Sequence, residues 1–367
     1  MGEDGSRGPG GQDGRPPGPA GTADATTAPK HTRRALLAGL GAAGLAGLGA
    51  AGLGAARVFG VGATTTRALG HLAPTPTMIP TATPDLRPAS VVITGDVMLA
   101  RTVTQRILAT SDNFPFEHTA NFLRDFDLTV GNLECVVSTL GSPVPKAFDL
   151  EATPAGFQRL QDAGFSLVSV ANNHSGDYGK DAFVDMLNHL KTNTIAWTGG
   201  GLNYAEAHQA KIVRIRQTVI GFLAYCGVEY FSYAATATTP GHAWLDPNAM
   251  HADIVAARPL CDFLIVFNHW GQEYQTVQNQ DQTNLAHLAI DSGADLVVGC
   301  HPHVIQPSET YNGKPIIYSL GNFVFDYMTD PLTSAGHVLT LRIQGSKLLD
   351  WKLVNIELGD WGQPALV

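Results

Sequence analysis

From about residue 90 onward, short apolar runs rich in valine and isoleucine alternate with more polar stretches. Seven of these runs are too short to be buried helices and are typical of strands covered on both faces. They span 90–94, 128–130, 167–170, 219–224, 263–267, 296–298 and 316–318. Because segments of helical character lie between them, the sequence predicts an α/β fold.

Three of the intervening segments carry helix signals. Thr153 as N-cap and Pro154 at the first helical position predict a helix that ends at Gly164. A second helix is predicted over 181–190, where apolar residues share one face, and a third over 281–292. The repeated order of strand, polar loop and helix places the loops at the carboxyl ends of strands, where α/β proteins bind ligands.

The pattern changes after residue 318. Two alternating runs, 338–343 and 348–356, are separated by Gly345-Ser346. This arrangement predicts a C-terminal β-hairpin that closes the fold.

The first 85 residues have a different composition. Residues 1–34 are rich in glycine, proline and alanine and end on Arg33-Arg34, and we expect them to be disordered because they can bury little apolar surface. Residues 35–56 contain only alanine, leucine and glycine, and 57–85 carry the Thr-Pro repeats of a stiff linker. The folded domain is therefore expected over 86–367.

A pair of arginines before an uncharged stretch of modest hydrophobicity is typical of a twin-arginine export signal. The alternative is a plain membrane anchor, since about 20 apolar residues suffice to cross a bilayer. We expect an exported protein, either extracellular or anchored on the outer face of the cytoplasmic membrane. Cleavage of the segment and membrane attachment through it stay open.

The net charge of the chain after residue 84 limits the classes of molecule that it is expected to bind. The chain has 23 Lys and Arg against 32 Asp and Glu; residues 1–84 hold seven of the former and four of the latter, which leaves 16 against 28, a formal net of −12, for the rest. A domain this acidic is poorly suited to nonspecific nucleic-acid binding. No nucleic-acid partner is expected.

Five short polar clusters stand where apolar runs end. Carboxylate, amide and imidazole groups are the ligands of divalent metals, and a site for two ions needs about six to eight of them from several loops. Each cluster is ambiguous alone, but the set predicts a metal site. The clusters are Gly95-Asp96, Asn132-Leu133-Glu134, Asn172-Asn173-His174, His269-Trp270-Gly271 and His301-Pro302-His303.

Two clusters give the sharper signals. His301 and His303 would face the same way on an extended segment, and neutral imidazole is the usual nitrogen ligand of zinc, manganese, iron or nickel. The Asn173 amide oxygen can ligate a metal while the adjacent His174 donates a proton or stabilises developing charge. The structural alternative for this second cluster is a turn capped by asparagine.

Other residues near the clusters have weaker signals. Cys135 and Cys300 are interpreted as small buried side chains, with a disulfide or a soft metal ligand as alternatives. Lys146 and Arg101 could contact an anionic substrate, although such residues are more often solvated surface charges.

In their order along the chain, these motifs resemble the CapA family, which is associated with capsule and poly-γ-glutamate synthesis. The resemblance covers about residues 90–326 and implies a metallophosphatase-like fold, similar to calcineurin-like phosphoesterases. That fold is a four-layer α/β sandwich, with two packed mixed β-sheets flanked by helices. The runs that carry the resemblance are 94–99, 130–134, 171–174, 177–179, 269–274, 293–304 and 318–326.

The resemblance also implies a ligand set for divalent metal ions, two of them in the family pattern, such as manganese, iron or zinc. Asp96 would be the first ligand and Glu134 the bridging carboxylate, with Asn132 as its competitor. The implied ligands are Asp96, Asn132, Glu134, Asn173, His269, His301 and His303.

The implied catalytic residue is His174, with Asp177 as the residue that orients it. Two positions depart from the family patterns. Met98 stands where phosphoesterases have a histidine, and Cys300 stands where a histidine usually precedes the His-Pro-His unit. One metal site is therefore expected to lack a ligand.

The sequence favours an exported CapA-like metal-dependent hydrolase, in which a metal-activated water attacks a phosphoester or γ-glutamyl bond. The alternative is a noncatalytic membrane-surface component that binds or guides an anionic γ-glutamyl polymer. The expected partners are this polymer or a phosphoester substrate, the membrane if the N-terminal segment is retained, and other polymer-synthesis proteins.

Overall fold

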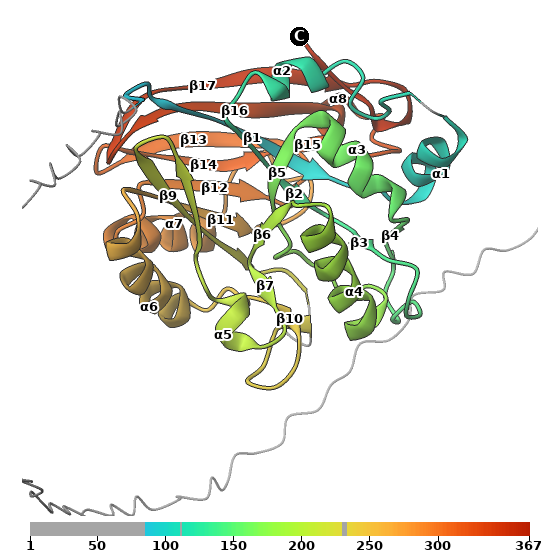
Figure 1. The fold of residues 1–367 in the computed structure, drawn as a ribbon, viewed down its shortest axis with the longest axis horizontal. Helices are drawn as coiled ribbons and strands as arrows, with labels where there is room; N and C mark the ends of the chain where they lie inside the picture. The colour runs from blue at the N-terminus through green and yellow to red at the C-terminus, as the bar shows by residue number, and fades with distance from the viewer. Residues whose placement is uncertain (1–84, 111, 230–232) are drawn as a thin grey trace, which may run out of the picture. The chain divides into compact units, whose positions relative to one another are not determined.

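The computed structural model describes residues 85–110, 112–229 and 233–367 (Figure 1). The predicted tail 1–34, the export or anchor segment 35–56 and all of the linker 57–85 except Asp85 lie outside the described residues. These assignments and the domain boundary at residue 86 stay predictions. Within the described part, no helix is both long and apolar enough to span a bilayer.

The first β-sheet has eight strands in the order β18-β17-β16-β1-β2-β5-β6, and β15 also pairs with β1. Strands β1, β2, β5 and β6 are parallel, whereas β16 is antiparallel to both β1 and β17. The strands are β1 Ala89–Val97, β2 Leu128–Leu133, β5 Phe165–Ser169, β6 Ala196–Thr198, β15 Asn322–Val324, β16 Ala335–Gln344, β17 Lys347–Leu358 and β18 Pro364–Leu366.

The second sheet has six strands in the order β13-β14-β12-β11-β9-β8. Its four central strands are parallel, and β13 and β8 pair antiparallel at the two edges. Both sheets are therefore mixed. The strands are β8 Lys211–Ile215, β9 Thr218–Cys226, β11 Phe263–His269, β12 Leu296–Cys300, β13 Ile305–Tyr311 and β14 Lys314–Leu320.

Two small two-stranded sheets, β3 with β4 and β7 with β10, and the helices complete the described part. The short strands are β3 Val136–Val137, β4 Glu151–Ala152, β7 Gly200–Gly201 and β10 Gly241–His242. The helices are α1 Arg101–Ala109, α2 Ala120–Arg124, α3 Ala155–Ala163, α4 Gly179–Thr192, α5 Tyr204–Ala207, α6 Pro247–Ala257, α7 Gln280–Ser292, α8 Pro331–Ser334 and the 3₁₀ helices η2 Arg258–Leu260 and η3 Asp360–Gly362.

Apolar side chains between the two sheets form the central core. Val91 and Ile93 of β1 belong to one buried cluster with Phe222 of β9 and Ile265 of β11. Val92, on the opposite face of β1, belongs to a cluster that includes the buried faces of α3 and α4. A third cluster joins the second sheet to α6 and α7, which lie beside it in Figure 1. The order of layers is therefore helices, sheet, sheet, helices.

The predicted sandwich of two mixed sheets flanked by helices is confirmed. Six of the seven predicted strands lie within an observed strand, and the seventh, 167–170, extends one residue beyond β5. The predicted C-terminal hairpin is formed by β16 and β17, and because β16 pairs with β1, the hairpin widens the first sheet.

The predicted start of the first helix is wrong. Pro154, not Thr153, occupies the N-cap position of α3, and no side chain caps this end. The Thr153 hydroxyl instead lies 3.2 Å from that of Thr104 in α1. The predicted end is confirmed, since Gly164 adopts a left-handed φ of 98° at the C-cap.

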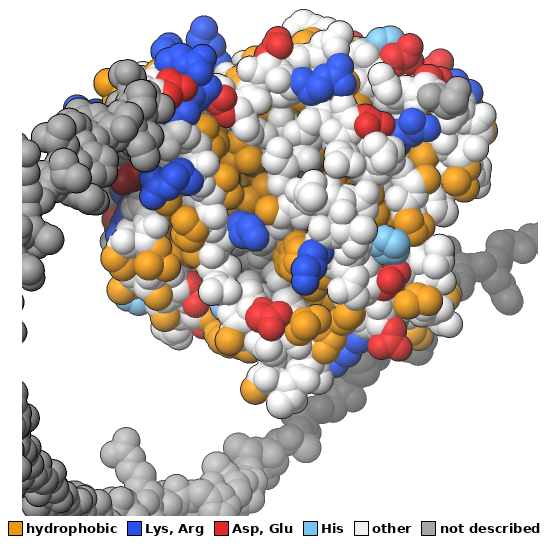
Figure 2. All heavy atoms as spheres, in the orientation of Figure 1, with side chains coloured by type: hydrophobic (Ala, Val, Ile, Leu, Met, Phe, Trp, Pro, Cys, Tyr) orange, Lys and Arg blue, Asp and Glu red, His pale blue; other side chains and the backbone are white. Residues whose placement is uncertain are grey.

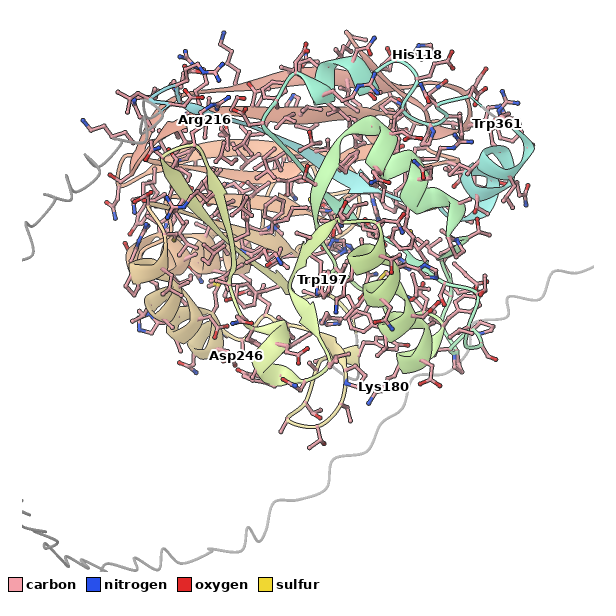
Figure 3. All side chains as sticks on the ribbon, in the orientation of Figure 1. His118, Lys180, Trp197, Arg216, Asp246 and Trp361 are labelled. Atoms are coloured by element: carbon pink, nitrogen blue, oxygen red, sulfur yellow. The ribbon has the colours of Figure 1, made fainter. Side chains whose placement is uncertain are left out.

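Charged side chains on the face drawn in Figure 2 are mostly scattered. Lys and Arg gather most densely at the corner where Figure 3 labels Arg216, and carboxylates lie among them. Arg216 pairs with Asp85 at 3.1 Å and with Asp127, and Arg87 pairs with Asp85 at 2.7 Å. These positive charges are neutralised locally by acidic partners.

The carboxyl ends of the parallel strands meet closely at one place. Backbone N–H of Asp96 in β1 donates to Gly321 O at 3.1 Å, just beyond β14 of the second sheet. Gly95 permits this approach, because a Cβ at that position would lie 2.0 Å from Gly321 O. The polar loops of the two sheets are thereby brought together.

Candidate metal centre

The structure brings all nine predicted site residues into one buried cluster. Asp96, Asn132 and His269 occupy the last two positions of β1, β2 and β11, and the others follow β2, β5 and β12. None of the nine is more than 7% exposed. Buried polar groups need partners, so the hydrogen bonds of this cluster show which groups the protein itself satisfies.

Asn132 links the two sheets at the site. Its Nδ2 donates to Asp96 Oδ1 at 2.8 Å and to His269 Nδ1 at 3.2 Å. Its Oδ1 accepts from Asn172 Nδ2 at 3.1 Å. Because protein groups engage both ends of this amide, Asn132 orients Asp96 and His269 and is less suited than Glu134 to bridge two ions.

Glu134 is fully buried, and among the described residues neither of its carboxylate oxygens has a hydrogen-bond donor. Its Oε1 lies 3.7 Å from His269 Nε2 and 3.6 Å from His303 Nε2. Burial, together with the neighbouring Asp96 carboxylate, holds the pKa of Glu134 well above its usual range. An ionised carboxylate is costly in such surroundings, so the site fits a cation that would compensate its charge.

Two groups of three side chains each have ligand atoms within 4.8 Å of one another. One comprises Glu134, His301 and His303, and the other comprises Asp96, Glu134 and His269. Glu134 belongs to both, as a bridging ligand would. Oxygen and imidazole donors suit manganese, iron and zinc. The residues therefore fit divalent metal ions, and Glu134 would be a ligand in either group.

His269 has its second nitrogen directed at a further predicted ligand. Since Nδ1 accepts from Asn132, the proton lies on Nε2, which donates to Asn173 Oδ1 at 2.8 Å. Burial lowers the pKa of His269 well below its usual range, and it does the same for His301. Both rings are thereby kept neutral, which is the form that binds metals. With its Nε2 deprotonated, His269 would be able to hold a metal ion together with Asn173 and Glu134.

The segment 301–303 is not extended, which corrects the sequence prediction. Strand β12 ends at Cys300, and His301 and His303 have left-handed φ values of 97° and 58°. The two rings still converge, with centroids 5.7 Å apart. Left-handed backbone at non-glycine residues costs about 1–3 kcal/mol each and is found most often at functional sites. The strained turns, and not the spacing alone, direct both rings towards Glu134.

Asn322 is a site residue that the sequence analysis missed. Its Oδ1 lies 3.0 Å from His303 Nδ1, and its Nδ2 donates to the backbone carbonyls of His303 and Thr333. An amide oxygen only accepts, so Nδ1 carries the proton and Nε2 is left for Glu134 or a metal. Asn322 comes soon after the buried strand β14, and a search for polar residues after each predicted strand could have found it.

His174 and Asp177 form a buried pair next to the predicted ligands. His174 Nδ1 lies 2.7 Å from Asp177 Oδ2, which also accepts from Leu150 N at 2.8 Å. Burial lowers the pKa of His174, although the Asp177 carboxylate opposes this shift. With Nδ1 engaged, Nε2 is the ring atom that can exchange a proton with a ligand.

Lys146 is not a solvated surface charge, because its side chain is only 10% exposed. Its Nζ donates to Asp177 Oδ1 and Asn173 O, both at 2.9 Å, and pairs with Glu229 at 3.1 Å. It lies 3.4 Å from Nδ1 of His174. Because it lies on the Nδ1 side of the ring, Lys146 supports the His174–Asp177 pair and is unsuited to contact a substrate at Nε2.

The two departures from the family patterns are both buried. Met98 Sδ accepts from Ala100 N at 3.0 Å, so its thioether is turned towards its own backbone. Burial holds the pKa of the Cys300 thiol well above its usual range, and a protonated thiol is a poor ligand. The four cysteines of the described part are free, and Cys135 and Cys300 are buried as predicted.

Solved structures with a similar arrangement include the calcineurin-like phosphoesterase YfkN from Bacillus subtilis, with 15% identity and a TM-score of 0.46 over 73% of this chain and 90% of that one. A hypothetical protein from Thermus thermophilus has 16% identity and a TM-score of 0.48 over 73% and 99% of the two chains. At scores below 0.5, these likenesses imply nothing about function.

Sequence relatives are more informative. The PGA biosynthesis protein CapA of Bacillus subtilis is 34% identical over 235 residues, which are 63% of this chain and 62% of that protein. The capsule biosynthesis protein CapA of Bacillus anthracis is 30% identical over 274 residues, or 72% and 67% of the two chains. The chain thus spans roughly two thirds of the length of these relatives.

The model of the family described as bacterial capsule synthesis protein PGA_cap matches residues 90–327. This range contains the nine predicted site residues and both sheets up to β15. Since the match covers well over half of the chain and agrees with the relatives, this chain belongs to the PGA_cap family of bacterial capsule synthesis proteins.

Proposed function

We propose that this chain is a metal-dependent hydrolase of capsule polymer synthesis that cleaves a phosphoester or γ-glutamyl bond. The Glu134 carboxylate carries the proposal, because it is buried without a donor and is shared by two groups of ligand atoms. The adjacent pair of His174 and Asp177 favours catalysis over a purely structural site, which has little use for an additional imidazole.

The chemistry divides between the ions and the chain's own residues. The ligands would be Asp96, Glu134, Asn173, His269, His301 and His303. Divalent ions supply an activated water and polarise the oxygen of the bond under attack. His174 would deliver a proton from Nε2 to the leaving group, and Asp177 would stabilise the imidazolium through Nδ1. Lys146 pairs directly with the Asp177 carboxylate and would hold it in position against His174.

The proposed substrate class comes from the relatives. Their names refer to PGA and capsule biosynthesis, and a Mycobacterium tuberculosis relative, 32% identical over 255 residues, is named a probable polyglutamine synthesis accessory protein. Poly-γ-glutamate carries one free carboxylate per unit, whereas polyglutamine carries a carboxamide. We therefore favour a γ-glutamyl bond over a phosphoester, with the polymer-synthesis machinery as the setting.

Export is part of the proposal. It is supported by the Arg33-Arg34 pair and the apolar segment 35–56. Replacing both arginines by lysine should leave the protein in the cytoplasm, measured by fractionation of cells that express the full chain. Unchanged export of this variant would contradict the twin-arginine assignment.

The central test compares metal content and hydrolysis in the full chain and in His174→Ala. We expect two metal ions per chain in both, with hydrolysis of a γ-glutamyl peptide or a phosphodiester lost only in the variant. His251→Ala is the matched control, because His251 is exposed on α6 and contacts Ser292. Bound metal without turnover on either substrate would instead support the noncatalytic polymer-binding role, and absence of metal would reject the site.

A further inference from the structure

Arg101, the first residue of α1, is held between two aromatic rings beside the metal centre. Its guanidinium carbon lies 5.3 Å from the ring centroid of Phe325 and 5.4 Å from that of Tyr327. Phe325 in turn packs edge-on against the ring of His303, with centroids 4.8 Å apart. A single aromatic ring therefore separates this positive charge from a predicted metal ligand.

The guanidinium of Arg101 keeps unused donor capacity. Its Nη2 contacts the side chain and carbonyl of Asp326, whereas its Nε is buried without a hydrogen-bond partner. A buried donor without an acceptor destabilises the folded state. The side chain is 29% exposed, so a ligand can reach it. A planar oxyanion would supply acceptors for its remaining N–H groups.

Asp326, which pairs with Arg101, and Asp330, which lines a hollow beside Tyr327, are both engaged by other groups of the protein. Asp326 accepts from Thr102 N at 3.0 Å and from the Thr102 hydroxyl, in addition to its pairing with Arg101. Asp330 accepts from Leu332 N at 2.8 Å and caps α8. These interactions hold both negative charges in place within the fold.

A hollow of about 400 Å³ is bordered by Tyr327, the ring on which Arg101 packs, and by Val304, the residue after His303. Tyr274, Val304, Tyr327 and Leu332 contribute to its walls. The Tyr274 ring lies 6.3 Å from that of His303, and Tyr327 borders the hollow while also packing on Arg101. The volume is within the range of small-ligand sites.

The backbone around the hollow is strained. Arg101, Tyr274 and Tyr327 have left-handed φ values of 52°, 63° and 61°, and they come from three separate segments of the chain, the first of them the start of α1. Tyr274 and Tyr327 are 54% and 69% exposed, so burial of their rings does not account for this conformation. Such strain is common where side chains are positioned for a ligand.

We propose that Arg101 and this hollow form a substrate subsite, in which the guanidinium binds the carboxylate of the γ-glutamyl unit beside the bond that is cleaved. This inference rests on the proposed function and names its specificity-determining residue. Arg101 is better suited to this role than Lys146, which lies behind His174 and is already paired with two carboxylates.

The test measures binding directly. A γ-linked glutamyl tripeptide and its α-carboxamide analogue are titrated calorimetrically into the metal-loaded full chain that carries His174→Ala, which suppresses turnover. Adding Arg101→Gln should weaken binding of the tripeptide about tenfold or more and leave binding of the carboxamide unchanged. Arg101→Lys should give an intermediate loss, because lysine keeps the charge and lacks the planar fork.

Matched controls separate recognition from folding. Arg106→Gln lies on the same helix, where Arg106 is 3.8 Å from Asp112, and it should bind the tripeptide normally. Tyr327→Ala removes an exposed ring and should weaken binding several-fold without unfolding the chain. Trp361→Ala removes another exposed aromatic residue with a left-handed backbone (Figure 3), which lines a neighbouring hollow, and it should have no effect.

The outcomes distinguish this inference from the proposed function. Equal tripeptide affinity with and without Arg101→Gln, or equal binding of the carboxamide and the tripeptide, would overturn the subsite. Another result would be that inorganic phosphate displaces the tripeptide from the wild-type Arg101 protein and fails to do so from Arg101→Gln. That result would mean that the guanidinium binds phosphate, and it would overturn the γ-glutamyl assignment. Arg101-dependent binding without hydrolysis by the His174-intact chain would reject only the hydrolase. Hydrolysis with a KM unaffected by Arg101→Gln would reject only the subsite.

Discussion

Strand β1 carries a polar cluster near each end, and the two clusters differ in how their charges are met. Near its start, Asp127 accepts from the backbone and hydroxyl of Ser90 at 2.8 and 2.7 Å and from both terminal nitrogens of Arg216. Near its end, Glu134 has no hydrogen-bond donor within the described part of the chain. The first cluster is complete within the protein, whereas the second needs a cation.

The shift in pKa follows the same division. Hydrogen bonds from Arg216 and Ser90 outweigh burial and lower the pKa of Asp127, while burial and Asp96 raise that of Glu134. Both clusters contain carboxylates within a few residues of the same strand. The residue types in a cluster therefore do not distinguish a structural cluster from a functional one. The hydrogen-bond donors of each carboxylate oxygen do distinguish them.

The largest expected effect tests the open cluster. Glu134→Gln keeps the shape of the side chain and removes its charge, so we expect loss of bound metal and a fall in kcat/KM of about 10³-fold or more, equivalent to about 4 kcal/mol. Metal analysis and steady-state kinetics measure this change. Full metal content in Glu134→Gln would break the comparison.

A smaller effect is expected one contact away from the metal ligands. Asp177→Asn should lower kcat by about 10²–10³-fold with metal retained, because the amide cannot stabilise the His174 imidazolium. Asp149→Asn is the control, since Asp149 is exposed and only accepts from the hydroxyl of Tyr178. Normal kcat in Asp177→Asn would show that the pair is structural.

His242 sharpens the comparison, because an unpartnered atom alone does not make a site. Its buried Nε2 has no partner, yet His242 belongs to neither group of potential metal ligands. Burial lowers its pKa to about 4, so the folded state binds fewer protons than the unfolded state between about pH 4 and 6.5. The contribution of His242 to the free energy of unfolding is therefore complete above about pH 6.5. As the pH falls from there towards 4, the free energy of unfolding decreases by about 3 kcal/mol through this group.

Urea unfolding of the wild type and His242→Leu at several pH values measures this contribution. The free-energy difference between the two proteins should change by about 3 kcal/mol from pH 7 to pH 4, in favour of the variant at low pH. A difference that stays constant with pH would mean that His242 is not the titrating group.

The smallest effect is expected at the closed cluster. Asp127→Asn weakens partly exposed pairing with Arg216, so we expect a loss of about 1 kcal/mol in the free energy of unfolding with metal content and kcat/KM unchanged. Chemical denaturation and kinetics on the same samples test it. A loss of metal in this variant would show that the two ends of β1 are coupled.

Local patterns predicted much of the fold and of the site. Buried apolar runs and the polar residues that follow them are properties of adjacent positions, and they identified the seven strands together with Asp96, Glu134, His269, His301 and His303. The family resemblance added roles to these residues. It did not add the geometry that makes Glu134 common to both ligand groups.

Tertiary structure decided the features that depend on distant segments. The left-handed turns at His301 and His303 are fixed in part by contacts such as that of His301 N with Asp96, 205 positions away. Lys146 behind His174 and Arg101 between two rings depend on loops that are remote in sequence. The ends of the strands can be predicted from a single sequence, because they depend on adjacent residues. The partners of a buried charge are determined only when the two sheets pack against each other.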